Sequence, residues 1–342
     1  MKLTHARRLA VIAGILLLVG TSSAFAQNQK GKKKGEAGKA EGYTSLTVNI
    51  PAVTLNLTVT DKDGNLITGL TRDYFKVYED KKEQTITNFF PDGSPVNVVL
   101  LLETSQWIQG LERDFWYGVM GFLQSLRPED YCALVTYDMK PRIVVDFTKN
   151  KNKIASEANV NLYYKGFRES NLSDAVAFTI DRMKDVEGKK AIVLLSTGLD
   201  TFSRMNYSDA LKVAESSDTV LYAISMGQLI RAVNEMGYSQ VTLSEFRMAD
   251  LRLRSFARKT GGEAYFPKFI SEYPSIFKNI SLYLRYQYTL AYRPENQNLK
   301  DEKRKIKVEA YADIDHDGKP DKLKVRCKES YRVEETAKSD KE

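Results

Sequence analysis

Histidine and cysteine are scarce in this 342-residue sequence, which contains two of each. His5 lies in an N-terminal segment that we expect to be removed, so His316 is the only histidine left. A Ser-His-Asp or Cys-His catalytic site is therefore excluded unless His316 serves, and no nucleophile motif accompanies it. Histidine-rich metal centres are excluded as well.

The two cysteines, Cys132 and Cys327, are too few for a disulfide framework or a cysteine-rich zinc site. Cys132 lies in an apolar run, and Cys327 alternates with Leu323 and Val325. Both patterns are typical of ordinary buried thiols, which we favour over a mutual disulfide.

Long apolar runs are also missing, apart from residues 9–20. That run is shorter than the roughly 20 residues that span a bilayer. Lys2, Arg7 and Arg8 precede it and Ala24-Phe25-Ala26 follows it, so residues 1–26 are interpreted as a signal peptide, the alternative being an uncleaved N-terminal anchor. We expect a periplasmic or secreted protein with no integral membrane segment after cleavage.

Positive charge is concentrated near the N-terminus, and the formal net charge of +7 falls to +4 without residues 1–26. Residues 27–43 hold five lysines with almost nothing to bury, which predicts a disordered linker. An exported protein rarely meets nucleic acid, so we expect no nucleic-acid partner. The charged tail, residues 334–342, is also predicted to be disordered.

The remaining chain divides into three parts. Residues 44–94 alternate apolar and polar positions, as half-buried strands do, and predict a β domain. Residues 95–284 alternate buried strands with helical patterns, which predicts an α/β fold with a doubly wound, mostly parallel, Rossmann-like sheet. Residues 285–333 form a second β region. Because a few strands are poorly stable alone, we expect the two β regions to pack together, as one β-sandwich, with the α/β domain inserted between them.

Two local expectations concern the α/β part. Ser208 is interpreted as the cap of a helix, and residues 227–243 as a long connection that leaves the carboxyl end of a strand. Ligands of such sheets bind beyond the carboxyl ends of the strands, so this connection would reach the binding face.

Three segments of the α/β part resemble the von Willebrand factor type A domain, namely residues 98–105 (VVLLLETS), 170–175 (SNLSDA) and 192–201 (IVLLSTGLDT). The flanks resemble a narrower group, the secreted von Willebrand A-related proteins frequent in acidobacteria. This second likeness rests on residues 59–64, 69–75, 260–262 and 288–294. The resemblance implies a protein-binding α/β domain.

The family's metal site uses an Asp-x-Ser-x-Ser loop, then a Thr, then an Asp, and holds Mg²⁺ that an acidic group of the partner completes. The matching positions in this chain are Glu103, Ser105, Trp107, Ser170 and Thr197. Asp200 could replace the missing second acid only if its loop is rearranged.

These departures predict a degenerate site in which Mg²⁺ is not expected. Mg²⁺ requires near-octahedral oxygen ligands at about 2.0–2.1 Å. We expect the additional methylene of Glu103 to push its carboxylate too far forward. The indole of Trp107 cannot coordinate, and Thr197 removes one negative charge.

Three side chains are candidates for binding a partner instead. Trp107 would lie on the rim of the binding face, and Met236 and Tyr238 belong to the long connection. Exposed aromatic residues anchor interfaces. The alternative places Trp107 over its own helix, against Trp116.

A second candidate metal site is the Asp-rich segment 313–321. Asp313, Asp315, Asp317 and Asp321, with Lys319 at the backbone-ligand position, match the first nine places of an EF-hand-type calcium loop. The twelfth place holds Lys324 instead of an acid, so we expect weak Ca²⁺ binding. The alternative is a solvated hairpin turn without an ion.

Taken together, the residues predict an exported, non-enzymatic module for protein binding, adhesion or scaffolding, which uses the carboxyl-end face of the α/β domain. One alternative is a hydrolase that uses carboxylates such as Glu103 and Asp200. Another is a structural component of an envelope complex. The identity of the protein partner cannot be predicted.

Overall fold

The computed structural model describes residues 52–91, 93–163, 166–233, 240–298, 303–314 and 316–333. The segments expected to be a signal peptide (1–26), a linker (27–43) and a tail (334–342) lie outside these residues. No helix among the described residues is long and apolar enough to cross a membrane.

The α/β part is built on a six-stranded sheet in the order β10-β9-β8-β5-β6-β7. Its strands are β5 (Val96–Glu103), β6 (Tyr131–Tyr137), β7 (Pro141–Thr148), β8 (Lys189–Ser196), β9 (Val220–Ser225) and β10 (Ala264–Tyr265). Only β7 pairs antiparallel with its neighbour. Because the chain leaves β5 toward β6 and later returns to place β8 on its other side, the strand order reverses between β5 and β8.

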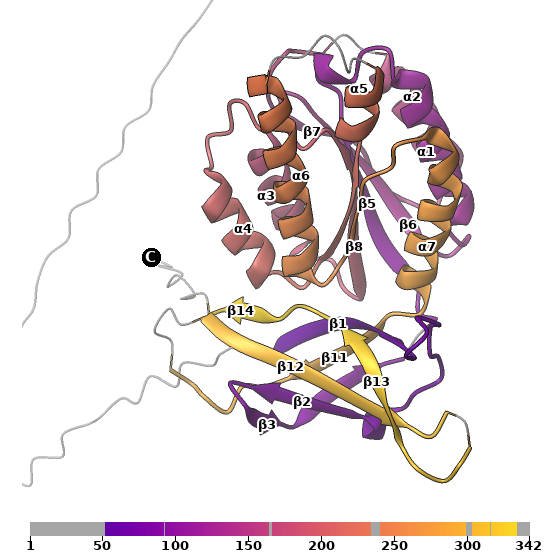
Figure 1. Cartoon of the computed structure of the whole chain (residues 1–342), viewed down its shortest axis with the longest axis vertical. Coiled ribbons are helices and arrows are strands. Elements are labelled where there is room, and N and C mark those ends of the chain that lie inside the picture. Colours follow the sequence, from indigo (N-terminus) through magenta and orange to yellow (C-terminus); the bar gives the residue numbers. More distant parts are fainter. Residues whose placement is uncertain are drawn as a thin grey trace, which may run out of the picture. The chain divides into compact units, whose positions relative to one another are not determined.

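Helices cover both faces of this sheet, as the sequence predicted (Figure 1). One face carries α1 (Glu112–Ser125), α2 (Lys151–Leu162) and α7 (Tyr273–Arg285), and α5 (Gly227–Val233) adds Leu229 and Ile230 to the same core. The other face carries α3 (Leu172–Met183), α4 (Tyr207–Ser216) and α6 (Gln240–Thr260).

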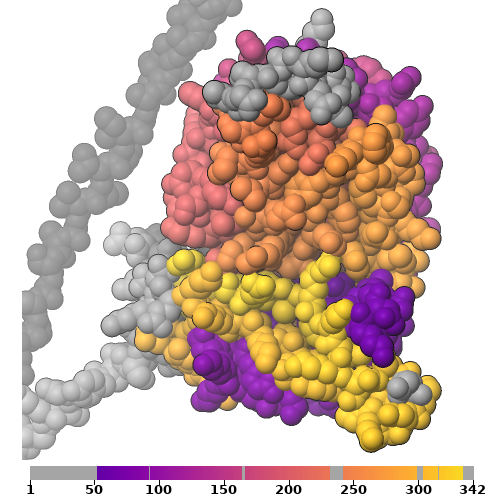
Figure 2. All heavy atoms as spheres, in the orientation of Figure 1, coloured from indigo at the N-terminus to yellow at the C-terminus, as the bar shows by residue number. Residues whose placement is uncertain are grey.

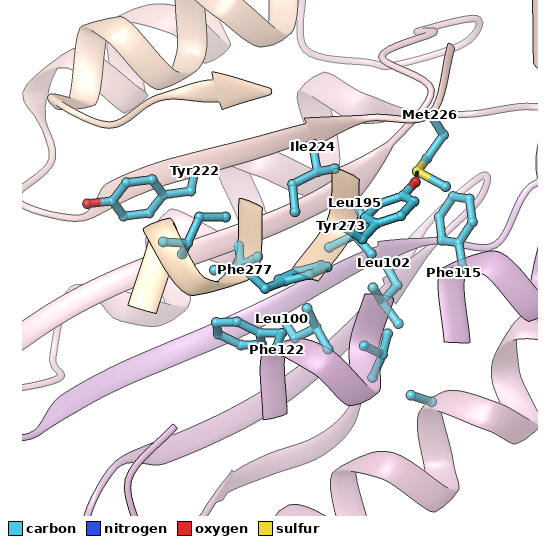
Figure 3. Close-up of a cluster of buried hydrophobic side chains, with 14 of the residues drawn as sticks. Leu100, Leu102, Phe115, Phe122, Leu195, Tyr222, Ile224, Met226, Tyr273 and Phe277 are labelled. Carbon is cyan, nitrogen blue, oxygen red and sulfur yellow. Dashed lines mark hydrogen bonds between the residues drawn. The ribbon is translucent and has the colours of Figure 1, made fainter. Parts of the chain in front are cut away.

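The first of the two cores is rich in aromatic rings (Figure 3). Phe122 of α1 lies 5.9 Å from Phe277 of α7, between ring centroids, and both are buried against Leu100 and Leu195 of the sheet. Gly118 permits this close approach, since a Cβ there would lie 3.2 Å from the Phe277 ring. Burying one such ring stabilises the fold by about 1.5–3 kcal/mol, and Phe277→Ala should cost about 3–5 kcal/mol.

The strands of the two β regions share one antiparallel sheet. These strands are β1 (Val53–Thr60), β2 (Phe75–Glu79), β3 (Lys82–Gln84), β4 (Ile86–Phe90), β11 (Tyr288–Tyr292), β12 (Lys303–Ala312), β13 (Asp321–Arg326) and β14 (Ser330–Arg332). They follow the order β3-β2-β12-β13-β1-β11-β4, with β14 paired to β12. Strand β1 therefore lies between β11 and β13, and the expectation that the two β regions pack together is confirmed.

The two ends of the strand order approach each other, so the sheet encloses one core in a sandwich-like or barrel-like way. Phe75 of β2 and Phe89 of β4 come from opposite ends of the strand order, yet their ring centroids lie 5.9 Å apart. Tyr288 contacts both rings. The apolar side chains of β1 and β12 are buried in the same enclosed core.

Three local expectations were wrong or incomplete. Residues 227–243 are not a long loop, because α5 and the start of α6 occupy most of them. Ser208 lies inside α4, and the cap is Asn206, whose side chain accepts a hydrogen bond from the Asp209 amide at 2.9 Å. Helix α2 was not expected from the sequence.

The two cysteines are free. Burial raises the pKa of both thiols, Cys132 and Cys327, to about 12. A thiol with so high a pKa is a poor nucleophile, which fits a packing role.

Candidate functional site

The carboxyl ends of β5, β6 and β8 meet at the point where the strand order reverses. Leu102 pairs with Leu195 across β5 and β8, and Glu103 pairs with Tyr137 across β5 and β6. Backbone hydrogen bonds join the loops that follow, from Gln106 to the Phe167 carbonyl at 2.9 Å and from Thr201 to the Ser170 carbonyl at 2.8 Å. We call this loop cluster the carboxyl-end face.

Glu103 is at the centre of the cluster and is fully buried. One carboxylate oxygen, Oε1, accepts hydrogen bonds from the Ser105 hydroxyl at 2.6 Å and the Thr197 hydroxyl at 3.0 Å. The other, Oε2, accepts from the Thr197 amide at 2.7 Å and the Ser196 hydroxyl at 2.9 Å. Hydrogen bonds to a carboxylate are stronger than those between neutral groups. Both oxygens of Glu103 thus have strong hydrogen-bond donors within the chain itself.

A tyrosine supports this arrangement from the neighbouring strand. The Tyr137 hydroxyl lies 2.7 Å from the Ser196 hydroxyl and donates a longer bond of 3.4 Å to Glu103. Burial raises the pKa of Tyr137 well above its usual value, and the nearby Glu103 carboxylate adds to the shift. Tyr137 therefore stays protonated and acts as a donor.

The direction of the Glu103 side chain corrects one expectation. We expected its additional methylene to push the carboxylate forward, out of the strand end. The carboxylate instead lies at the end of β8. There it accepts hydrogen bonds from the Thr197 amide and from the hydroxyls of Ser196 and Thr197. The extra length lets the carboxylate reach donors on β8 that β5 does not supply.

Ser170 and Asp200 lie on the two loops beside Glu103. The Ser173 amide and hydroxyl both donate to Oδ2 of Asp200, the amide at 3.1 Å. Oδ1 of Asp200 is buried and accepts no hydrogen bond from the described residues. Asp200 thus positions the first turn of α3 and does not join Glu103.

The donor set does not fit a magnesium ion. Mg²⁺ needs near-octahedral oxygens and usually keeps several waters. Both oxygens of Glu103 already have donors, the Ser105 hydroxyl donates to Glu103, and Trp107 has no oxygen. Among the described residues, no group of three or more His, Cys, Asp or Glu side chains is arranged to hold a metal ion.

Trp107 is half-buried and packs edge-on against Phe246 of α6, with ring centroids 6.2 Å apart and an interplanar angle of 87°. Its indole Nε1 is buried and donates to none of the described residues. The ring therefore packs on α6, against Phe246, and not against Trp116 as in the alternative reading, while half-burial leaves part of it exposed. The other two candidates, Met236 and Tyr238, lie outside the described residues.

Two aromatic residues that the sequence reading passed over are exposed beside the site. Phe167 is 55% exposed, and its carbonyl holds the Gln106 amide. Phe202 is 71% exposed and follows Thr201, whose amide bonds to Ser170. Each stands among polar residues, in KGFRES and DTFSRM, and an isolated aromatic in such a loop was the available signal.

The Asp-rich segment forms the turn between β12 and β13. Asp313 accepts hydrogen bonds from the amides of Asp317 at 3.1 Å and Gly318 at 2.9 Å, and Asp317 accepts from the Lys319 amide at 2.8 Å. Asp321 is the first residue of β13. Asp315 lies outside the described residues, so the expected ligand set is seen only in part.

Residues 97–252 match the von Willebrand factor type A domain family. This chain contains a von Willebrand factor type A domain. Glu103, Ser170 and Thr197, the positions that the sequence resemblance predicted, all lie within the matched segment and in loops of the carboxyl-end face.

Solved structures with similar chains include three bacterial proteins. An aerotolerance-related membrane protein from Bacteroides fragilis is 14% identical over 55% of this chain and 98% of its own, with a TM-score of 0.42. The vWF domain of a type V pili tip protein from Porphyromonas gingivalis is 13% identical over 55% and 94%, with a TM-score of 0.43. A von Willebrand factor type A protein from Catenulispora acidiphila is 10% identical over 85% and 76%, with a TM-score of 0.45. No curated protein sequence matches the chain.

Proposed function

We propose that this chain is an exported, non-enzymatic module for protein binding, as in adhesion or scaffolding. It binds its partner at the carboxyl-end face of the von Willebrand factor type A domain without a metal ion. We also place it in the narrower group of secreted von Willebrand A-related proteins. The observation that carries the proposal is the hydrogen-bonded Glu103 carboxylate, whose charge is satisfied by the chain itself.

Metal-independent binding follows from the position of that charge. In the family, a metal ion at this point bridges to an acid of the partner. Glu103 is fully buried and already has internal donors, so it offers no charge for a bridging ion. A partner must then recognise other groups on the same face.

The exposed rings of Phe167 and Phe202 are the groups best suited to that recognition. They flank the Ser170 loop and are 55% and 71% exposed. Aromatic side chains are enriched at interfaces and supply much of the binding energy when a partner covers them.

The same geometry supports a non-enzymatic role. Hydrolysis by two carboxylates requires both acids to reach a substrate. Glu103 has no exposed surface, and Asp200 accepts its hydrogen bonds from Ser173. We therefore do not assign a catalytic role to either acid.

The test compares binding of a purified partner, obtained by cross-linking on intact cells, to three forms of the chain. We expect the double variant Phe167→Ala/Phe202→Ala to bind at least tenfold more weakly, because each truncated anchor costs about 1–2 kcal/mol. Tyr117→Ala is the matched control, since Tyr117 is 59% exposed on α1 and does not belong to these loops. EDTA should leave the affinity of all three forms unchanged.

Two results would contradict the proposal. Loss of wild-type binding in EDTA, restored by Mg²⁺, would show that an ion is required. Wild-type affinity in the double variant would place the partner elsewhere, for instance on the β-sheet, as expected for a structural component of an envelope complex.

A further inference from the structure

A basic groove lies between the C-terminal end of α6 and strands β12 and β13, at the end of the α/β part that is opposite to Glu103 (Figure 1). Two adjoining hollows of about 660 and 940 Å³ form it, and they share Arg258, Ile306, Lys307 and Glu329. Figure 2 shows the orange end of α6 next to the yellow strands. The groove is at the amino end of the sheet strands, because Gly262 lies against the Leu221 carbonyl at the start of β9.

Positive charge is gathered in this groove. Four acidic residues line it (Asp80, Glu263, Glu309 and Glu329), against nine basic ones (Lys81, Arg254, Arg258, Lys259, Lys303, Lys305, Lys307, Lys324 and Arg326). Residues 44–342 as a whole carry a formal net charge of only +1, since eight of the basic and two of the acidic residues lie before them. The local excess is therefore a property of this groove and not of the folded chain.

Strand β12 sets the spacing of the charges. Lys303, Lys305 and Lys307 are exposed at alternate positions, while Arg304 and Ile306 between them are buried. Alternate residues of a strand lie about 6.6–6.8 Å apart on one face. The side chains of Lys303, Lys305 and Lys307 therefore leave β12 at regular intervals on the same face.

Part of this charge is not neutralised by the residues that the structure describes. Lys303 pairs with Glu215 at 3.2 Å, and Lys307 pairs with Glu309 at 2.7 Å. Within the described ranges, the exposed side chains of Lys81 and Lys305 have no acidic partner. Both line the larger hollow, so an anion placed there would meet unpaired charge.

The lining of the groove is not only charged. Val325 and Tyr283 are half-buried and contribute apolar surface beside the basic residues. A phosphate or sulfate polymer has no apolar side chains to use that surface. An extended peptide presents acids on one face and apolar side chains on the other, at the period of the lysine row.

We propose that this groove binds an extended acidic segment of a partner protein, with carboxylates at alternate positions facing Lys303, Lys305 and Lys307. The proposal is independent of the carboxyl-end face and of its partner. Such binding weakens at high salt, because exposed charges are screened beyond about 10 Å at 0.1 M ionic strength.

The experiment is fluorescence anisotropy on the full chain with a labelled twelve-residue peptide of repeated Glu-Val-Glu-Thr. The comparison peptide has the same composition with all glutamates contiguous, and inorganic polyphosphate serves as a competitor. We expect the alternating peptide to bind at least fivefold more tightly than the block peptide. Lys305→Ala/Lys307→Ala should weaken its binding at least tenfold.

The matched control is Lys153→Ala/Lys278→Ala, since both lysines are exposed on helices away from the groove. This pair should leave the affinity unchanged, and the melting temperatures of both double variants check that folding is retained. Equal binding of the two peptides, or full displacement by polyphosphate at matched charge, would overturn the proposal in favour of a general polyanion surface. Wild-type affinity in Lys305→Ala/Lys307→Ala would overturn it as well.

Discussion

The Glu103 carboxylate at the end of β5 accepts hydrogen bonds from both the amide and the hydroxyl of Thr197, at the end of β8. The sequence resemblance matches these two positions to two acids of the family's metal site. In this chain the second position holds Thr197, which donates to Glu103. An acid at position 197 would repel Glu103 unless a cation lay between them. Thr197 instead donates two hydrogen bonds to the Glu103 carboxylate.

Removing the acid of this pair should destabilise the domain. Glu103→Ala leaves the Ser105 hydroxyl and the Thr197 amide buried without an acceptor, which costs roughly 1–3 kcal/mol for each unsatisfied group. We expect a loss of about 3 kcal/mol, measured as a lower urea midpoint at an unchanged slope. Glu129→Ala, at a more exposed position that forms an ion pair with Arg127, should lower the free energy of unfolding by less than about 0.5 kcal/mol. A wild-type midpoint for Glu103→Ala would refute the role assigned to these bonds.

Restoring the family pattern should restore metal binding. Calorimetric titration of the wild type with Mg²⁺ should give no binding heat. The triple variant Glu103→Asp/Trp107→Ser/Thr197→Asp has Asp at both acid positions and gains a hydroxyl at position 107. We expect it to bind Mg²⁺ and to melt at a higher temperature in its presence. Tight binding by the wild type that disappears in Glu103→Ala would sink the account of a degenerate site.

We propose that the Asp-rich turn binds Ca²⁺ weakly, with a dissociation constant of about 10⁻⁴–10⁻³ M. Lys324 occupies the twelfth place of the loop pattern, and its ammonium group donates to the Lys62 carbonyl at 2.7 Å. Lys324→Glu should tighten Ca²⁺ binding about tenfold by adding a carboxylate. The readout is the rise in melting temperature with Ca²⁺, which Asp317→Asn should reduce. Asp63→Asn, in the neighbouring turn, is the control, and no response of the wild type to millimolar Ca²⁺ would exclude the proposal.

Lys328 should make stability depend on alkaline pH. Its side chain is buried and donates to the Ser217 carbonyl at 3.1 Å, and burial lowers its pKa to about 8 from an ordinary value of 10.5. Between these two values the unfolded chain holds the proton more often than the folded chain does, so this group contributes stability that increases as pH rises from 8 to 10.5.

The measurement is the difference in unfolding free energy between the wild type and Lys328→Met, determined at pH 7 and at pH 10. We expect the wild type to gain stability relative to Lys328→Met between pH 7 and pH 10, by at most about 3 kcal/mol. Lys278→Met, at an exposed position, should show no such trend. A constant difference across this range would mean that Lys328 is not desolvated as the fold implies.

Periodicity predicted most of the architecture because buried strands and amphipathic helices differ strongly in their apolar spacing. The strands β5, β8 and β9 are apolar on both faces and were predicted from that alone. Helix α2 was not predicted because it buries only Ile154, Ala158 and Leu162 among polar residues. Helix α5 was predicted as part of a loop because a short helix within a long connection has no clear apolar period.

The site could be predicted only as a set of positions. The positions that resemble the family's metal ligands were matched one by one in the sequence. The hydrogen bonds of Glu103, however, come from donors 93 and 94 residues away along the chain. Local sequence carries no information on such a contact. The packing of Trp107 on Phe246 has the same cause, since the two rings meet only after α6 folds onto the sheet.

The shared β-sheet also determines how the chain carries mechanical load. Residues 53–60 pair with β11 and β13, and β12 joins β13 to β14 at the other end of the described chain. A pull applied at residues 52 and 333 is therefore resisted by the antiparallel ladders of the β-sheet. The von Willebrand factor type A domain enters and leaves this sheet through β4 and β11, which pair with each other. The domain therefore lies outside the strands that carry the load, and we expect the loops of its carboxyl-end face to keep their shape while the chain is stretched.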